Sequence, residues 1–382
     1  MKICIIANGF PDKREPQWGC FERDQAIALK NAGHDIAIIY VDKRFRRYWR
    51  KIGLTHKTEE GIKVYGYFLA PMKPVSFVSK WLYDKLVSWM YDYVFKVICK
   101  HWGMPDVIYA HYIFNIYYGA ELKEKYNVPC VGIEHWSGLT RETLPKKYNE
   151  QWKYGYTHID KLLAVSESLR KHIKRHYGID STVVHDMLGP EFISTDFHIK
   201  EKDSVFRFIA VGSLLPIKGY DGLISAFAKS GLADKDCKLS IVGNGPERSV
   251  LEQIVKESKL ENSVVLHGRK TKQELIQLLS ESHVFILSSK AETFGVACIE
   301  ALSQGVPAIA TKCGGPEEII DKTNGILVET GNLDALADAM KEMYSNYCQY
   351  DNTAIANECL SKFSPNVIAN QLTEIFKEVT TN

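Results

Sequence analysis

The sequence has no Cys-x-x-Cys pair, and its nine cysteines lie at spacings that suit neither a metal site nor a disulfide framework. We therefore expect reduced thiols and a cytoplasmic protein. No apolar run approaches the roughly 18 residues that a membrane-spanning helix needs. The apolar stretch after Met1 is also too short for a signal peptide. These absences favour a chain that is soluble or, at most, peripheral on the inner face of a membrane.

A large net charge is absent as well. Lys and Arg number 48 against 46 Asp and Glu, which leaves a formal charge of +2. Such a chain has no overall positive field to hold a nucleic acid through counterion release, so we expect no nucleic-acid partner. The length of 382 residues, at about 150 residues per domain, suggests two or three domains, of which two is our first estimate.

Short runs rich in Ile and Val alternate with amphipathic segments, a pattern typical of an α/β fold with parallel sheets. The first set of expected strands covers residues 3–7, 35–41, 106–110, 130–134 and 161–165. The second set covers residues 206–211, 238–242, 264–267, 283–289, 306–310 and 325–328. The polar stretch 194–204 between the sets is the expected linker. The sequence thus predicts a first domain over 1–195 and a second over 205–363.

Two glutamates follow the expected strand that ends at Ser289. Glu292 and Glu300 are separated by seven residues, and Gly295 lies where a helix is expected to begin, near Phe294. Free amides at a helix start could hold a phosphate or a polar sugar group. Glu300 could accept hydrogen bonds from ribose hydroxyls, and Glu292 could do the same for a sugar. The alternative is that Glu292 only favours the helix dipole and that Glu300 is solvated.

Lys218 and Gly219 stand in a turn between a strand and a helix, which is the arrangement of a phosphate-binding turn. A lysine is electrostatically unfavourable at a helix start, so its presence favours a ligand over a solvated surface position. Further glycine turns, at 243–246 and 313–320, also follow expected strands. Because open α/β sheets bind ligands where the strands end, these turns together predict a ligand rim.

Several of these motifs occur in an order that resembles the retaining family 4 glycosyltransferases of the GT-B fold. They are Gly212, Lys218-Gly219, the turn 243–246, the Glu292 and Glu300 pair, and the segment 314–320. The resemblance implies an α/β architecture of two facing Rossmann-like domains with parallel sheets and a deep interdomain cleft. It also implies that a C-terminal helix over 364–382 packs back on the first domain. No metal and no cofactor are implied, because the nucleotide sugar is a substrate.

The resemblance assigns roles in the second domain. Lys218 resembles the lysine that contacts the donor diphosphate, and Glu300 resembles the acid that holds the nucleotide ribose. Glu292 is similar to the acid that binds donor-sugar hydroxyls. The segment that approaches the phosphate and the sugar is matched by the backbone of Phe294, Gly295 and Val296.

In the first domain, Gly19 resembles the glycine whose loop approaches the donor phosphates. His111 resembles the histidine near the donor sugar and the acceptor. His135 lies in the loop 134–141 after another expected strand, and we expect it to contact the donor sugar or the acceptor. The alternative for His135 is a buried position between the domains.

One position of the diphosphate site departs from the family pattern. Ser213 stands where many members have an arginine. A hydroxyl can donate a hydrogen bond, but charge-assisted bonds are about twice as strong. Either Arg269 or another basic residue compensates, or the diphosphate is held more weakly.

The segment 43–51 carries six basic residues interleaved with three aromatic ones. This composition is typical of contact with an anionic membrane surface, which would deliver an enzyme to a lipid-linked acceptor. A solvated loop explains the segment equally well. The aromatic stretch 75–102 has helical spacing and is expected to be a packed domain helix.

The expected function is retaining transfer of a sugar from a nucleotide diphosphate sugar to a glycan or lipid-linked acceptor, in surface polysaccharide or glycolipid biosynthesis. The expected catalytic residues are His111, Lys218 and Glu292. Neither glutamate is expected beneath the anomeric carbon, where a retaining hydrolase has its nucleophile, so we expect front-face attack. Two alternatives stay open: an NADP-dependent oxidoreductase, weakened by Arg248 in place of a third glycine, and a non-catalytic sugar-nucleotide sensor, suggested by Ser213.

Overall fold

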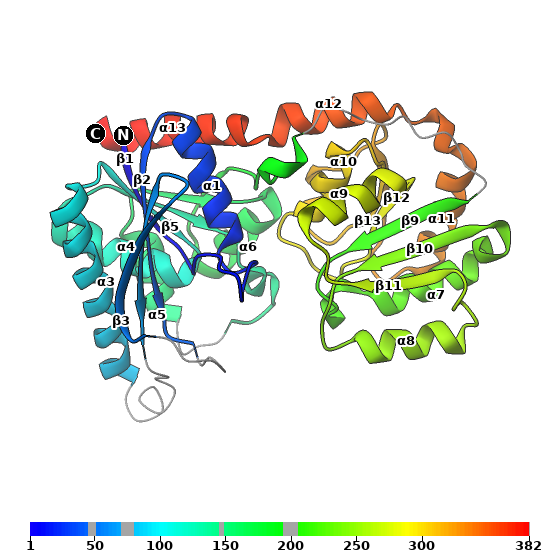
Figure 1. Cartoon of the computed structure of the whole chain (residues 1–382), viewed down its shortest axis with the longest axis horizontal. Coiled ribbons are helices and arrows are strands. Elements are labelled where there is room, and N and C mark those ends of the chain that lie inside the picture. The colour runs from blue at the N-terminus through cyan, green and yellow to red at the C-terminus, as the bar shows by residue number, and fades with distance from the viewer. Residues whose placement is uncertain (45–50, 70–79, 145–148, 194–204, 382) are drawn as a thin grey trace. The chain divides into compact units, whose positions relative to one another are not determined.

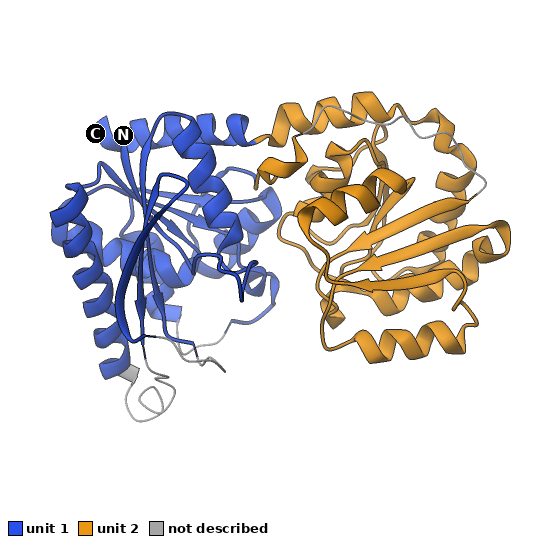
Figure 2. Ribbon diagram, in the orientation of Figure 1, with its two compact units in different colours: residues 1–185, 365–382 blue, residues 186–364 orange. Residues whose placement is uncertain are grey.

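The computed structural model describes residues 1–44, 51–69, 80–144, 149–193 and 205–381 (Figure 1). The chain divides into two compact units, which Figure 2 colours separately. Unit 1 holds Met1–His185 and Pro365–Asn382, and unit 2 holds Asp186–Ser364. Each unit is described by itself below. The expected linker 194–204 lies outside the described residues.

The boundary after His185 lies earlier than the expected residue 195. The reason is the segment around Leu188 and Phe192, whose side chains are fully buried. The backbone N–H of Leu188 donates to the carbonyl oxygen of Phe363 at 2.9 Å, and the Gln304 amide donates to the carbonyl oxygen of Phe192 at 3.4 Å. These contacts place the segment in unit 2 before the polar stretch begins.

Unit 1 is built on an eight-stranded sheet in the order β3-β4-β2-β1-β5-β6-β7-β8 (Figure 1). Neighbouring strands are parallel except β3 and β4, which are antiparallel. The expected first set of strands is confirmed as β1, β2, β5, β6 and β7. The strands are β1 (Lys2–Ile6), β2 (Asp35–Asp42), β3 (Gly53–Glu59), β4 (Ile62–Phe68), β5 (Val107–His111), β6 (Cys130–Glu134), β7 (Lys161–Ala164) and β8 (Thr182–Val183).

Helices cover both faces of this sheet. Two adjacent residues of β5 show this, because successive side chains of a strand point to opposite faces. The ring of Tyr109 lies 5.1 Å from the ring of Phe376 in α13, whereas Ala110 faces Gly119 of α4. α13 also packs against α1, so the C-terminal helix belongs to unit 1. The helices are α1 (Cys20–Asn31), α3 (Lys80–Trp102), α4 (Ile113–Tyr126), α5 (Asn149–Thr157), α6 (Glu167–Tyr177) and α13 (Pro365–Thr381), with the 3₁₀ helix η1 (Ser137–Thr140).

The hairpin of β3 and β4 is not among the expected strands. β3 lies at the sheet edge, and its side chains from His56 to Thr58 are exposed, so it needs no apolar run. The turn at Glu60 and Gly61 has positive φ at both residues, 51° and 76°. Two such residues are typical of a tight hairpin turn. The Glu-Gly pair is therefore the sequence signal that could have predicted it.

Unit 2 is built on a parallel six-stranded sheet in the order β11-β10-β9-β12-β13-β14. The expected second set of strands is confirmed in full. The strands are β9 (Phe206–Val211), β10 (Cys237–Val242), β11 (Val264–Gly268), β12 (Val284–Leu287), β13 (Ala308–Thr311) and β14 (Gly325–Val328).

The core of unit 2 lies between the sheet and its helices. One continuous apolar cluster joins β9, β10 and β12 to α7, α8 and α11, and α10 packs on α12. The helices are α7 (Tyr220–Ser230), α8 (Arg248–Glu257), α9 (Lys272–Glu281), α10 (Val296–Ser303), α11 (Leu333–Asn346) and α12 (Asn352–Phe363). The 3₁₀ helices are η3 (Pro190–Phe192), η4 (Pro216–Lys218), η5 (Leu232–Lys235), η6 (Gly315–Glu318) and η7 (Tyr347–Gln349).

The basic segment 43–51 is not a uniformly exposed patch. The Lys43 ammonium lies 5.4 Å from the Tyr118 ring centroid, and burial lowers the pKa of Lys43 to about 8. Arg44 stacks 3.5 Å over Trp18 and pairs with Asp42 at 3.1 Å. Lys43 and Arg44 thus have contacts within unit 1, although Arg44 is still exposed, and the expected membrane contact of the segment is not tested by them; residues 45–50 lie outside the described residues. No helix within the described part of the chain combines the length and apolar character needed to cross a membrane.

Candidate functional site

The candidate residues of unit 2 lie where its strand order reverses. The chain adds strands outward from β9 to β11 on one side and from β12 to β14 on the other, so β9 and β12 are the neighbours at the reversal. Loops that follow such a pair leave in opposite directions, which opens a crevice at the carboxyl edge of the sheet. The loops 212–219 and 288–295 follow these two strands.

The structure brings Lys218 and Glu292 together. The Lys218 ammonium forms an ion pair with Oε2 of Glu292, and the two side chains are 26% and 15% exposed. The hydroxyl of Ser288 donates to the Lys218 carbonyl oxygen at 2.9 Å, which ties the two loops. The Glu292 backbone is held by an N–H bond to the carbonyl oxygen of Cys313 at 2.9 Å and by the Gly315 N–H at 3.1 Å. Both charged groups are therefore fixed on rigid backbone and still reach solvent.

Glycines allow these loops to approach each other this closely. A Cβ on Gly219, whose φ is +65°, would lie 2.3 Å from the carbonyl oxygen of Ser288. A Cβ on Gly243 would lie 1.8 Å from the carbonyl oxygen of Gly212. Any side chain at either position would push the backbones apart. The glycine turns that the sequence shows are thus required by backbone contact at the strand ends.

The start of α10 lies directly after Glu292. Gly295 precedes the helix with φ +111°, and Phe294 is buried against Phe363, 5.5 Å between ring centroids. The side chain of Phe294 is thus in the core, and only its backbone can serve a ligand. Val296 and Glu300 are partly exposed on the first turns of α10. The helix start offers amide groups beside Glu292.

Ser213 is exposed in the loop after β9, whereas Arg269 is exposed after β11. β10 separates β11 from β9, so the strand ends near Arg269 and Ser213 are about 10 Å apart. Another lysine follows β12 on backbone next to that of Lys218: the side chain of Lys290 is exposed, and its backbone N–H donates to the carbonyl oxygen of Ile217 at 2.7 Å. Its position just after β12 is the signal that could have identified it.

Unit 1 repeats this arrangement. Its strand order reverses between β1 and β5, and the loop after β1 leads to Gly19 while β5 ends at His111. Gly19 has φ +77°, and a Cβ there would lie 2.3 Å from the carbonyl oxygen of Gly9. The loop can close only with glycine at this position. Gly19 and His111 thus both belong to the reversal point of the unit 1 sheet.

His111 and His135 are hydrogen-bonded partners. Nδ1 of His111 lies 3.2 Å from Nε2 of His135, and the two ring planes are parallel within 1°. The backbone N–H of His135 donates to the buried Glu134 at 3.0 Å, and the Tyr156 hydroxyl donates to the same carboxylate at 2.5 Å. Burial raises the pKa of Glu134, against the effect of these hydrogen bonds. Glu134, which the sequence marks only as a member of the loop, therefore positions His135.

We expect His111 to stay neutral in weakly acidic solution. Burial, and secondarily the charge of His135, holds the pKa of His111 well below its usual 6.5. In the unfolded chain this histidine becomes protonated near pH 6.5, whereas in the folded chain it stays neutral. The free energy of unfolding therefore decreases as the pH falls below 6.5. The His111 ring signals can be assigned in NMR spectra because they are absent from the His111→Gln variant. Their chemical shifts should stay constant from about pH 7.5 to about pH 5.5. A midpoint near 6.5 would contradict the burial argument.

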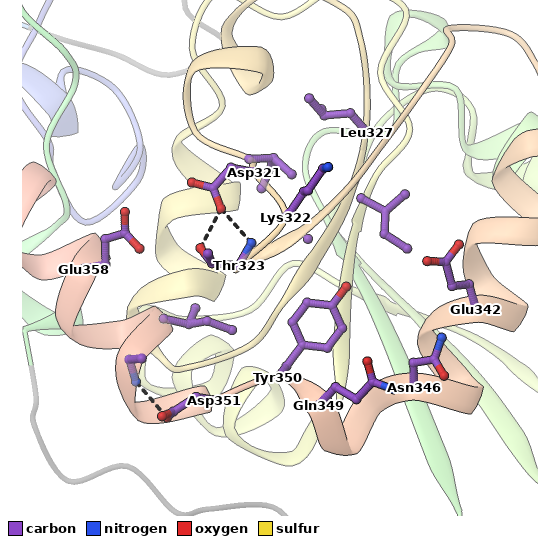
Figure 3. Close-up of a pocket in the computed structure, with 15 residues that line it drawn as sticks. Asp321, Lys322, Thr323, Leu327, Glu342, Asn346, Gln349, Tyr350, Asp351 and Glu358 are labelled. Carbon is purple, nitrogen blue, oxygen red and sulfur yellow. Dashed lines mark hydrogen bonds between the residues drawn. The ribbon is translucent and has the colours of Figure 1, made fainter.

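The pocket in Figure 3 lies at the other edge of the unit 2 sheet. Its volume is about 750 Å³, and its lining includes Asp321 and Thr323, which come before β14, with residues of α11 and α12. The Asp321 carboxylate accepts the Thr323 N–H at 2.7 Å and its hydroxyl at 2.5 Å. The strands of a parallel sheet begin at this edge, whereas Lys218 and Glu292 lie where they end. The pocket is therefore separate from the candidate site.

Two family models match the chain, and they meet near the boundary of the two units. The model described as Glycosyltransferase Family 4 matches residues 23–186. The model described as Glycosyl transferases group 1 matches residues 192–358. Together the two matches span most of the chain.

Curated relatives are similar at moderate identity. The chain is 29% identical over 245 residues to an uncharacterised glycosyltransferase of Methanocaldococcus jannaschii, which covers 63% of this chain and 66% of the relative. It is 28% identical over 253 residues to the N-acetyl-alpha-D-glucosaminyl L-malate synthase of Bacillus anthracis, which covers 63% of each. A putative teichuronic acid biosynthesis glycosyltransferase of Bacillus subtilis is 25% identical over 365 residues, which covers 89% and 88%. The chain thus spans just under two thirds of the first two relatives and most of the third.

Solved structures share the fold over the whole chain. Sucrose-phosphate synthase from Thermosynechococcus elongatus superposes with a TM-score of 0.79 at 18% identity, covering 100% of this chain and 99% of that one. The Anabaena protein HepE, solved in complex with UDP, superposes with a TM-score of 0.73 at 17% identity, covering 99% of each. At these identities the likeness concerns the fold alone.

Proposed function

Because the chain belongs to the family 4 glycosyltransferases of the GT-B fold, we propose that it transfers a sugar from a nucleotide diphosphate sugar, with retention, to a glycan or lipid-linked acceptor. The observation that carries the proposal is the pairing of Lys218 with Glu292 at the strand reversal of unit 2, beside the start of α10. Surface polysaccharide or glycolipid biosynthesis is the proposed setting, which the teichuronic acid relative supports.

In this proposal, donor binding changes the anion that pairs with Lys218. Without a donor, Lys218 pairs with the carboxylate of Glu292. A bound diphosphate would take the ammonium, and Glu292 would then accept hydrogen bonds from hydroxyls of the donor sugar. Amides at the start of α10 add positive potential for the phosphates. Glu300, further along the same helix, would hold the ribose.

The proposed mechanism is front-face attack. Lys218 and the helix amides stabilise the leaving diphosphate, which helps to deprotonate the acceptor, so catalysis rests on charge stabilisation and positioning. His111 stays neutral and could hydrogen-bond the donor sugar. Its Nε2 is buried and has no hydrogen-bond partner within the described residues, which supports a substrate hydroxyl in that place. The proposal includes no metal ion and no cofactor, because Lys218 supplies the cation.

A contact of the segment 43–51 with an anionic membrane also stays a proposal. Its support is now the exposed Lys51 and the arginines of the sequence at 46, 47 and 50, since Lys43 and Arg44 are engaged within unit 1. Flotation with anionic vesicles at low and high salt tests it, and salt-sensitive binding is the supporting result.

A thermal-shift screen with UDP, GDP, ADP and NADP tests the proposed function. We expect one nucleoside diphosphate to raise the melting temperature, because a ligand that binds only the folded state stabilises it. Incubation with the matching sugar nucleotides should then give sugar transfer or slow hydrolysis, and NMR of the product should show a retained anomeric configuration. Stabilisation by NADP alone would favour an oxidoreductase. Binding with neither transfer nor hydrolysis would favour a sensor.

A further inference from the structure

A second cavity lies within unit 1, between three helices. Its volume is about 830 Å³. Its walls are the first turns of α3, the middle of α4 and the first turns of α5. The lining residues are Trp81, Asp84, Lys85, Ser88, Tyr117, Glu121, Asn149, Glu150, Gln151 and Tyr154.

The topology places this cavity toward the edge of the sheet where the strands end. α4 and α5 follow β5 and β6, so each begins at that edge, and α3 begins there because its other end leads to the start of β5 (Figure 1). His111 ends β5, and His135 follows β6. The cavity walls therefore lie toward the same edge of the sheet as the candidate residues of unit 1.

Aromatic side chains form part of the cavity wall. Trp81 is 67% exposed, and the Lys85 ammonium lies 4.9 Å from its ring centroid. The rings of Tyr117 and Tyr154 lie 5.6 Å apart, one from α4 and one from α5. Gly155 allows this approach, because a Cβ there would lie 2.9 Å from the backbone of Tyr117. The cavity wall thus includes an exposed indole and two tyrosine rings that lie near each other.

The charged groups of the cavity are mostly carboxylates. Three carboxylates, from Asp84, Glu121 and Glu150, stand against the single cation of Lys85. Oε1 of Glu121 accepts the Tyr117 hydroxyl at 2.8 Å. Burial raises the pKa of Glu121, which fits a carboxyl enclosed by the helices. Sugar hydroxyls donate to carboxylates and amides, and sugar C–H faces pack on aromatic rings, so this lining suits an uncharged carbohydrate.

We propose that the cavity between α3, α4 and α5 binds uncharged sugar residues of the acceptor glycan, away from the residue that receives the transferred sugar. This inference rests on the proposed function and adds to it the class of acceptor. The excess of carboxylates disfavours phosphates and uronic acids by like-charge repulsion. The same excess disfavours an anionic lipid surface at this place.

The test measures glycan binding without any donor. The probes are neutral tetrasaccharides of glucose, mannose, galactose and N-acetylglucosamine, with tetragalacturonate as the anionic counterpart. Binding of each probe to the full chain is measured by isothermal titration calorimetry. We expect at least one neutral probe to bind and tetragalacturonate not to bind. Trp81→Ala should weaken the binding about tenfold, which corresponds to about 1.4 kcal/mol and lies within the range of an aromatic contact.

Leu82→Ala and Trp89→Ala are the matched controls. Both residues are exposed on α3, at 51% and 53%, and neither lines the cavity. We expect both variants to bind the neutral probe as the wild type does, and Glu121→Gln to weaken binding without loss of fold. Flotation with anionic vesicles tests the alternative of a lipid contact. If Trp81→Ala and Trp89→Ala weakened vesicle binding equally and no glycan bound, α3 would be a lipid-binding helix and the proposal would be overturned.

The outcomes for the cavity and for the proposed function are separable. Absence of binding for every neutral probe, or equal binding by Trp81→Ala and wild type, overturns the cavity proposal even if sugar transfer is normal. If no sugar nucleotide binds but a neutral probe still binds in a Trp81-dependent manner, the cavity stands and the proposed function fails. Donor hydrolysis without acceptor should be the same in Trp81→Ala and wild type, because unit 2 holds the proposed donor residues.

Discussion

Lys218→Ala is expected to lower kcat/KM for sugar transfer about 10²- to 10³-fold, the range found when one preorganised donor to a developing anion is removed. Lys218 is the cation that pairs with Glu292 at the strand reversal of unit 2, and Ser213 supplies no charge in the loop after β9. The same change should abolish most of the thermal shift produced by the nucleoside diphosphate. The Lys218 side chain is 26% exposed, so its removal should leave folding intact.

Lys312→Ala is the matched control for this prediction. Lys312 also pairs with a glutamate of unit 2, Glu329, at 2.5 Å, but both side chains are well exposed, at 44% and 67%. An exposed ion pair contributes little to stability, so this variant should bind the nucleotide and turn over as the wild type does. Near-normal transfer by Lys218→Ala would remove Lys218 from the mechanism and would point to Lys290, which is exposed beside it.

Most strands of both sheets could be predicted because runs of apolar residues indicate buried strands. Every residue of β5, β6, β12 and β13 is buried, and a strand covered on both faces is apolar along most of its length. β3 lacks that signal because it forms an exposed edge. The unit boundary shows the same limit, since unit 2 begins before the polar stretch, with the fully buried Leu188 and Phe192.

The residues of the candidate site could be named from sequence, but their pairing could not. Lys218 and Glu292 are 74 positions apart, and only the adjacency of β9 and β12 makes them neighbours. A strand order is set by how whole helices pack, so no local pattern carries it. Likewise, nothing in the sequence near His135 indicates that its ring meets His111 or that Glu134 is buried beneath it.

Lys43 shows how composition can mislead about the exposure of a single basic residue, although Arg44 beside it is exposed. Lys43 and Arg44 follow β2 directly, so their direction is fixed by a buried strand. Lys43 thus lies against Tyr118, and Arg44 lies over Trp18 near the loop that leads to Gly19. A count of charges cannot separate such residues from solvated ones, because long basic side chains can pack their stems or planes on aromatic rings.

Glu292→Gln is expected to separate donor binding from transfer. The amide keeps the shape of the side chain but gives up the charge that pairs with Lys218. Lys218 is then free for the diphosphate, so the nucleoside diphosphate should bind as tightly as to wild type, or more tightly. Hydrogen bonds to a charged group contribute about 1.5 to 3 kcal/mol, so loss of those from the donor sugar to the carboxylate should lower kcat about 10- to 100-fold.

The measurement is calorimetry with the nucleoside diphosphate beside steady-state transfer, and Glu329→Gln, the partner of Lys312, is the control. Lys218→Ala and Glu292→Gln should move nucleotide affinity in different directions while both reduce transfer, because the ammonium holds the diphosphate and the carboxylate holds the sugar. If Glu292→Gln instead lowered nucleotide affinity as much as Lys218→Ala does, the ion pair would act as one structural unit that shapes the loop. The separate roles proposed for the two residues would then be wrong. An equal loss of nucleotide affinity in both variants would instead indicate that the loop between β12 and α10 had collapsed.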